Sequence, residues 1–252
     1  MSRQQAPVAR AITFGDLEDG VWGAAWLGQE AFASVGVIGG APAILTEAAT
    51  LAGQGPGEDW RLEGDGVELV LAPAGDAVLA LAGREPVGFD QLCRVDGSVT
   101  LELAQRSVAC LGRRSARRRP FDTERFESLR EVSAWYEPGE GVVLSSLRPR
   151  GARGHDADTI TASLLEPTEA PPVVDPRLST TYTATGEPAR MSLELWLESD
   201  GDAEQFPRRI TGETLGTRAL ISSGALEFDA APLRCHSRGR AGAGAYLLIR
   251  AR

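Results

Sequence analysis

The 252-residue chain contains no lysine, so its 26 basic side chains are all arginines. The absence excludes a Walker-type phosphate loop, because the lysine of that loop reaches the terminal phosphates of the nucleotide. It also excludes a Schiff base with pyridoxal phosphate or with a carbonyl substrate. Asparagine is absent as well, and the lack of both residues beside abundant alanine, glycine and arginine is typical of GC-rich codon usage.

Histidine and cysteine are scarce. The two histidines, His155 and His236, lie far apart, and the cysteines Cys93, Cys110 and Cys235 do not have the spacing of metal ligands. Because a transition-metal site needs three or four soft ligands, we predict no metal centre, and no cofactor motif is present. An odd number of cysteines fits a reducing compartment better than a disulfide framework.

Long apolar segments are missing too. No stretch approaches the roughly 20 apolar residues of a membrane-spanning helix, and residues 1–7 lack the apolar region of a signal peptide. The net charge of -9 argues against binding to nucleic acid or anionic lipid. We therefore expect a cytoplasmic bacterial protein with no membrane span and no nucleic-acid partner. Its oligomeric state cannot be inferred.

One basic segment stands out against this acidic background. Five arginines lie in Arg113–Pro120. A basic run that ends in proline between apolar segments is typical of a linker or connecting loop. A nucleic-acid patch is the alternative, but the run has no interleaved aromatic residues, which favours the linker.

Short apolar runs bounded by glycine, proline and aspartate dominate what is present. Most have the length of strands, and Ser192–Glu198 and Gly66–Leu71 alternate between apolar and polar residues. Helical signal is limited to Ala41–Ala52 and Thr123–Arg130. This pattern predicts an all-β fold of antiparallel sheets, each with one buried face.

The two halves of the chain resemble each other in short segments that occur in the same order. Ala25-Trp26 resembles Ala134-Trp135, and Val67–Leu71 resembles Leu193–Leu197. Such resemblances favour an internal repeat, although any two strand-rich segments look alike. The repeat predicts two tandem units that form antiparallel β-barrels or sandwiches, with domains at 1–115 and 121–252.

Two β units of this size, each opening with a tryptophan-bearing hairpin, resemble the two-domain lipocalin-like group. This group includes carotenoid 1,2-hydratase, the AttH-like proteins, tocopherol cyclase and certain fungal Diels–Alderases. The resemblance is carried by Asp16–Trp26, Ala134–Tyr136 and the closing segment Arg238–Tyr246. It implies a pocket for a hydrophobic small molecule and cofactor-free addition, cyclisation or isomerisation, but no particular catalytic residue.

His155 is the first candidate for a catalytic acid or base, because few other groups in the chain titrate near neutral pH. Asp156 or Asp158 would orient its ring, and Arg148 or Arg153 would stabilise an anion. The alternative is an inert polar loop exposed to solvent.

The acidic segment before Trp22 is the second candidate. Asp16 and Asp19 would act as general acids if the neighbouring indoles removed water from their carboxyl groups. The alternative is a solvated hairpin turn, which the Asp-Gly sequence favours.

Large aromatic residues at strand positions would supply the walls of a substrate site or fill a core. The candidates for substrate binding, together with Arg148, are Trp22, Trp26, Trp135, Tyr136 and Trp196.

These observations lead to three hypotheses. The first is a cofactor-free enzyme, a hydratase, cyclase or isomerase that acts on a terpenoid- or polyketide-like hydrophobic molecule by acid/base catalysis. The second is a non-catalytic carrier of an apolar ligand, and the third is a structural or interaction module. The nature of any internal cavity would distinguish them.

Overall fold

The computed structural model describes residues 8–28, 30–45, 49–166, 170–198 and 206–252. Within these ranges the chain forms strands and one short 3-10 turn, so the all-β prediction is confirmed. The weak helical signals were wrong: the described part of Ala41–Ala52 contributes to two short strands, and Thr123–Arg130 leads into a long one. No helix in the described ranges is long and apolar enough to cross a membrane.

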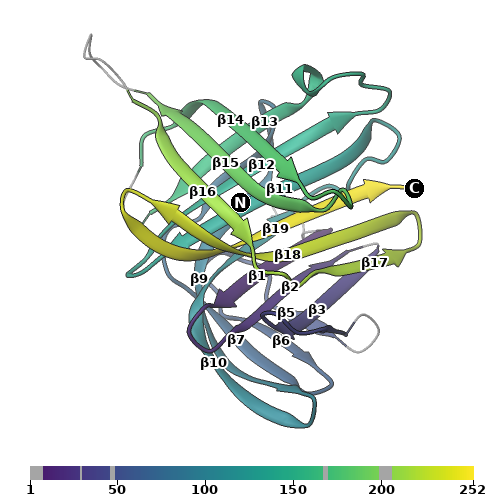
Figure 1. The fold of residues 1–252 in the computed structure, drawn as a ribbon, viewed down its shortest axis with the longest axis vertical. Helices are drawn as coiled ribbons and strands as arrows, with labels where there is room; N and C mark the ends of the chain where they lie inside the picture. Colours follow the sequence, from purple (N-terminus) through teal and green to yellow (C-terminus); the bar gives the residue numbers. More distant parts are fainter. Residues whose placement is uncertain (1–7, 29, 46–48, 167–169, 199–205) are drawn as a thin grey trace, which may run out of the picture.

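The first half of the chain forms one antiparallel sheet (Figure 1). Its order is β4-β3-β2-β1-β10-β9-β7-β6-β5, and β8 pairs with β9 beside this path. The strands are β1 (Ala9–Asp16), β2 (Val21–Leu27), β3 (Ala31–Val37), β4 (Pro42–Ile44), β5 (Thr50–Ala52), β6 (Trp60–Gly64), β7 (Val67–Pro73), β8 (Val78–Ala82), β9 (Glu85–Leu101) and β10 (Ala104–Arg117).

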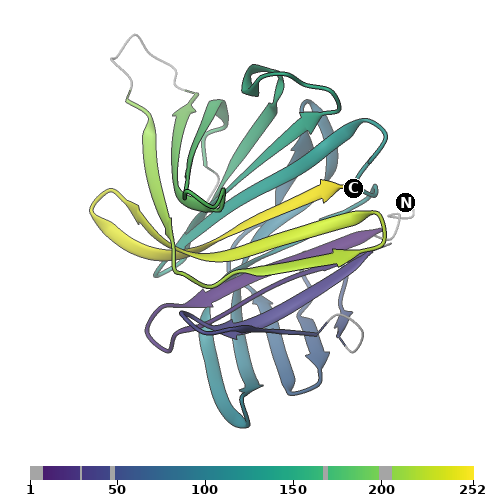
Figure 2. The same cartoon turned by 45° about the vertical axis from the view of Figure 1, so that its right-hand side comes forward.

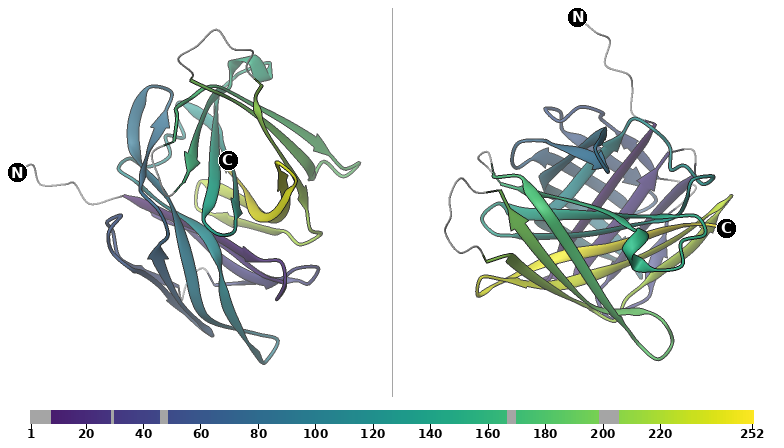
Figure 3. Two further views of the ribbon diagram at one scale, coloured as in Figure 1. Left: turned by 90° about the vertical axis from the view of Figure 1, so that its left-hand side faces the viewer. Right: turned by 90° about the horizontal axis from the view of Figure 1, so that it is seen from above.

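The second half forms a second antiparallel sheet in the order β13-β12-β11-β19-β18-β16-β15-β14, with β17 paired to β18. Its elements are β11 (Phe126–Tyr136), β12 (Glu140–Pro149), the 3-10 turn η1 (His155–Ala157), β13 (Thr159–Leu165), β14 (Val173–Tyr182), β15 (Pro188–Leu197), β16 (Arg208–Thr214), β17 (Ala219–Ser223), β18 (Leu226–Ser237) and β19 (Arg240–Ala251). Both sheets curl into barrel-like units (Figure 3).

The two units pack back to back, and side-chain alternation along their strands builds three layers of core. One apolar cluster fills the first unit and another fills the second. The third layer lies between the sheets, where β18 and β19 run beside β1 and β2 (Figure 2). On β11, Val132 and Ala134 face the core of the second unit, whereas Leu129 and Trp135 face the first sheet.

Turn chemistry agrees with the local sequence. Asp65-Gly66 joins β6 to β7 as a two-residue hairpin turn, and Gly66 has a φ of 70°. Only glycine adopts this left-handed conformation without a steric penalty, which is why Asp-Gly marks the turn in the sequence.

The arginine-rich segment is not a linker throughout. Its first residues, up to Arg117, form the end of β10, and Arg113, Arg114 and Arg117 are all buried. The connection between the sheets is the shorter stretch 118–125. The division into domains 1–115 and 121–252 and a nucleic-acid role for the exposed arginines remain untested.

The two sheets share a connection pattern. In each, the first strand pairs with the second and with the last: β1 with β2 and β10, and β11 with β12 and β19. The sequence resemblances do not follow this correspondence, because Ala25-Trp26 lies in β2 whereas Ala134-Trp135 lies in β11. The internal repeat in the sequence therefore stays a prediction.

Candidate functional site

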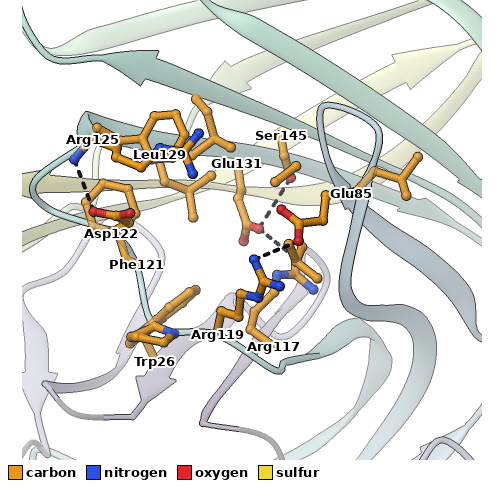
Figure 4. A pocket seen from close by; sticks show the side chains of 16 residues that line it. Trp26, Glu85, Arg117, Arg119, Phe121, Asp122, Arg125, Leu129, Glu131 and Ser145 are labelled. Atoms are coloured by element: carbon orange, nitrogen blue, oxygen red, sulfur yellow. Dashed lines mark hydrogen bonds and ion pairs between the residues drawn. The ribbon is translucent and has the colours of Figure 1, made fainter.

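A partly open cleft of about 160 Å³ lies between the two units (Figure 4). Side chains from both sheets and from the β10–β11 connection line it: Trp26, Leu81, Ala82, Glu85, Val87, Arg117, Arg119, Pro120, Phe121, Asp122, Arg125, Phe126, Leu129, Glu131, Ser145 and Leu147. Its lining is mainly apolar with a few convergent charges, as in small-molecule sites.

Strand periodicity places these side chains. On β11, Leu129 and Glu131 are two residues apart and point to the same side, toward the first sheet. Ser145 and Leu147 do the same on the neighbouring strand β12. Trp26 comes from the outer face of β2, and Figure 4 shows it across the cleft from Glu131.

The deep end of the cleft is a buried cluster of two cations and two anions, all at most 8% exposed. Glu131 Oε2 accepts from Arg113 Nη1 at 2.8 Å, and Glu131 Oε1 accepts from Arg117 Nη2 at 2.8 Å. Asp90 Oδ1 accepts from Arg113 Nε at 2.9 Å and from Arg117 Nη2 at 3.1 Å. The cluster, Asp90, Arg113, Arg117 and Glu131, is electrically balanced and joins the two sheets.

Glu131 is a permanent anion in this setting. Burial by itself raises the pKa of Glu131, but the charges and hydrogen bonds of Arg113 and Arg117 outweigh it and bring the pKa to about 2. Ser145 Oγ lies 3.4 Å from Glu131 Oε1. At neutral pH this carboxylate cannot donate a proton, and its negative charge is balanced by Arg113 and Arg117.

The low pKa predicts a specific pH dependence of stability. The folded-state pKa of Glu131, about 2, lies below the value of about 4.3 in an unfolded chain. Its contribution is therefore fully present above about pH 4.5 and is lost as the pH falls toward about 2. Urea unfolding of the wild type and of Glu131→Gln from pH 7 to pH 2 should show a stability difference that shrinks over this window. A difference independent of pH would contradict the assignment.

Of the aromatic residues predicted to bind substrate, only Trp26 lines the cleft. Trp22 and Trp135 are almost fully buried between the sheets, in the apolar layers on either side of the charged cluster. Tyr136 is buried in the core of the second unit, and burial raises its pKa. Trp196 lies on β15 with the Arg177 guanidinium 5.9 Å from its ring.

Asp16 and Asp19 do not lie in the cleft. The Asp16 carboxylate accepts the backbone N–H groups of Glu18 at 2.9 Å and of Asp19 at 3.1 Å, which closes the turn between β1 and β2. Asp19 itself is exposed. This is the arrangement of the solvated turn that the sequence left open as the alternative.

The residues around His155 are also away from the cleft. His155 begins η1, but its side chain lies outside the described part of the structure. Asp156 is exposed, and Asp158 pairs with Arg148 at 3.3 Å. Arg148 is on the face of β12 opposite Ser145 and Leu147, so the catalytic roles predicted for this group remain untested.

Metal and thiol chemistry find little support in the described residues. Among them, no three His, Cys, Asp or Glu side chains gather as metal ligands. All three cysteines are free and buried, and burial raises the pKa of Cys93 and of Cys235 to about 12. These thiols are protonated at neutral pH and therefore poor nucleophiles.

The fold is that of the two-domain lipocalin-like group, which confirms the resemblance seen in the sequence at the level of architecture. CghA bound to Sch210972 superimposes with a TM-score of 0.64 at 10% identity, covering 98% of this chain and 89% of CghA. An AttH-type protein of Nitrosomonas europaea gives 0.63 at 10% identity, covering 96% of this chain and 91% of its own.

Kievitone hydratase from Nectria haematococca also shares the fold, with a TM-score of 0.59, 10% identity and coverage of 97% of this chain and 89% of the hydratase. No protein-family model and no curated protein matches the sequence.

Proposed function

We propose that the cleft between the two units binds a hydrophobic small molecule and that the protein acts on it as a cofactor-free hydratase, cyclase or isomerase. The observation that carries the proposal is the lining of the cleft, in which an apolar wall around Trp26, Phe121 and Leu129 faces the fixed anion Glu131. A hydratase and a protein crystallised with a small molecule share the fold, which supports this class of function.

The chemistry of such a cleft follows from its groups. Addition of water to a double bond, or its cyclisation, develops positive charge on carbon when protonation comes first. The π-face of Trp26 would stabilise that charge, assisted by the Glu131 carboxylate, whose own charge is shared with Arg113 and Arg117. Proton transfer would fall to the carboxyl groups nearer the mouth, Glu85 and Asp122.

A second hollow lies next to the cleft and could enlarge it. The connection that carries Pro120 and Phe121 separates the cleft from this hollow of about 130 Å³, and Trp26 lines both spaces. A small displacement of this connection would join the two hollows. A molecule of terpenoid or polyketide size would then fit, as the sequence resemblance implies.

Trp26→Ala should weaken binding of an apolar ligand by about tenfold or more, because a large buried aromatic contact is lost. The measurement is isothermal titration with β-ionone, farnesol and geraniol, beside native mass spectrometry that shows which ligands the protein retains from its own host. Trp196→Ala is the matched control and should bind as the wild type does. Equal affinities for Trp26→Ala and the control would exclude the cleft as the binding site.

The alternative is a carrier that binds without reaction. Incubation of the ligand in isotopically labelled water separates the two. A hydratase incorporates the labelled oxygen, a cyclase or isomerase yields a product of unchanged mass and new retention time, and a carrier returns the ligand unaltered.

A further inference from the structure

A third hollow, a partly open cavity of about 210 Å³, lies in the second unit. It is on the opposite side of β11 and β12 from the cleft, near the edge strands β13 and β14, which adjoin without forming a ladder among the described residues. Its lining is largely polar: Arg130, Ser146, Asp158, Ile160, Leu178, Ser179, Thr180 and Tyr182.

Arg130 is the unusual member of this lining. It directly precedes Glu131 on β11 and therefore points to the other face of the strand. Its Nη2 donates to Tyr182 Oη at 3.2 Å, and its side chain also interacts with Tyr246, but its buried Nε has no acceptor in ordinary geometry among the described residues. No carboxylate among the described residues forms an ion pair with Arg130. The buried Arg113, Arg117 and Arg208, by contrast, each pair with two carboxylates. A buried donor without a partner is costly, so this guanidinium is suited to an external acceptor.

Two hydroxyl groups nearby are poorly partnered. Thr180 Oγ1, from a residue that lines the cavity, is buried and has no hydrogen-bond partner among the described residues. Tyr246 Oη, deeper in the same unit, has no partner in ordinary geometry but lies close enough to Arg130 for a hydrogen bond that lowers its pKa. Burial raises the pKa of Tyr246 to about 12 against the opposing charge of Arg130, so the phenol keeps its proton.

The charges of the lining select the ligand. Asp158 is paired with Arg148 at 3.3 Å, and Ser146 Oγ lies 3.4 Å from Asp158. The lining of the cavity therefore carries a net positive charge, which is that of Arg130. Glu127, 3.8 Å from Arg148, is half exposed and screened by water. A ligand with one negative charge would neutralise the site, whereas a dianion would be repelled by Asp158.

We propose that this cavity binds a small organic monocarboxylate. Its carboxylate accepts from the Nε and Nη2 edge of Arg130, which presents two parallel donors to a planar anion. A hydroxyl group on the ligand reaches Thr180 Oγ1, and its short apolar body lies on Ile160 and Leu178. The site does not depend on the proposed chemistry of the cleft, because β11 and β12 separate the two spaces.

Isothermal titration of the full chain with benzoate and 3-hydroxybutyrate tests the proposal, with phosphate and neutral benzyl alcohol for comparison. We expect both carboxylates to bind more tightly than phosphate or benzyl alcohol. Arg130→Gln should weaken them at least tenfold, because a charged hydrogen bond is lost. Arg177→Gln, an exposed arginine of β14 paired with Asp175 at 2.7 Å, is the control and should bind normally.

Three results would overturn the proposal: no binding of either carboxylate, equal affinities for wild type and Arg130→Gln, or loss of carboxylate binding in Trp26→Ala, which would place the ligand in the cleft. Should Arg130→Gln fail to fold, Thr180→Val replaces it. This variant removes one hydroxyl and should lower the affinity for 3-hydroxybutyrate but not for butyrate. An unchanged preference between these two acids would also contradict the assignment.

Discussion

Glu131→Ala should destabilise the protein by about 3–5 kcal/mol, since it leaves two buried guanidinium groups with one carboxylate between them. Arg113 and Arg117 are 2% and 8% exposed, so water cannot replace the lost partner. Urea unfolding at pH 7 measures the change. The effect is large because the cluster joins the two sheets and its loss weakens the whole interface.

The matched control is Glu213→Ala, which removes the carboxylate of an exposed Glu–Arg pair. Its partner Arg190 is 64% exposed, and pairs of this kind contribute about 0.2–1 kcal/mol. Replacing all four charged residues of the cluster by apolar residues of similar volume should recover much of the lost stability. If Glu131→Ala and Glu213→Ala unfolded at the same urea concentration, the cluster would not hold the interface together.

Arg114→Met should produce the second large effect, a loss of roughly 3 kcal/mol or more, because two buried and two partly buried acceptors lose their donor at once. Arg114 is fully buried inside the first unit and uses all five of its N–H groups. Nε and Nη2 donate to Gln91 Oε1 at 2.9 and 2.7 Å, and the others reach the carbonyl groups of Pro56, Glu58 and Leu71 at 2.6–2.8 Å.

The carbonyl groups of Pro56 and Glu58 belong to the segment before β6, which this arginine holds against the barrel beside Trp60. Hydrogen exchange should therefore show faster exchange in residues 53–59 of Arg114→Met than in the wild type. Arg114→Lys should not rescue the fold, because an ammonium group cannot reproduce five donors in a planar fork. Arg106→Met, an exposed position on the same strand, is the control. Unchanged exchange in residues 53–59 would show that Arg114 does not anchor this segment.

The sequence determined the class of fold. Apolar residues at every second position, as in Gly66–Leu71, bury one face of a strand whatever its neighbours are, and Asp-Gly favours a tight turn, as at Asp65-Gly66. Such local rules predict strands and their buried faces, and they led to the all-β prediction, whereas the two barrel-like units were predicted from the internal resemblances and the family resemblance. The composition by itself excludes chemistry that needs a lysine, because the absence of a residue type does not depend on folding.

Only the tertiary structure decided where the candidate site lies. Arg113 and Arg114 are neighbours that point to opposite faces of β10, one toward Glu131 of the other sheet and one toward a loop of its own. In the sequence both belonged to a basic run with the composition of a linker. Nothing local distinguishes a buried arginine from a solvated one, because the difference lies in carboxylates and carbonyl groups brought from distant strands.

The candidates for catalytic groups, His155 and Asp16, were likewise chosen from local sequence, which does not show which ionisable residues line a cleft. Density of ionisable residues along the chain marks loops and turns, whereas Glu131 lies within the strand β11, between Arg130 and Val132. Its role depends on the packing of β11 against β10 of the first sheet, which sets both its burial and its two ion pairs. The chain therefore determines locally which side chains share a face, and long-range packing of the two sheets determines which of those faces encloses a cleft.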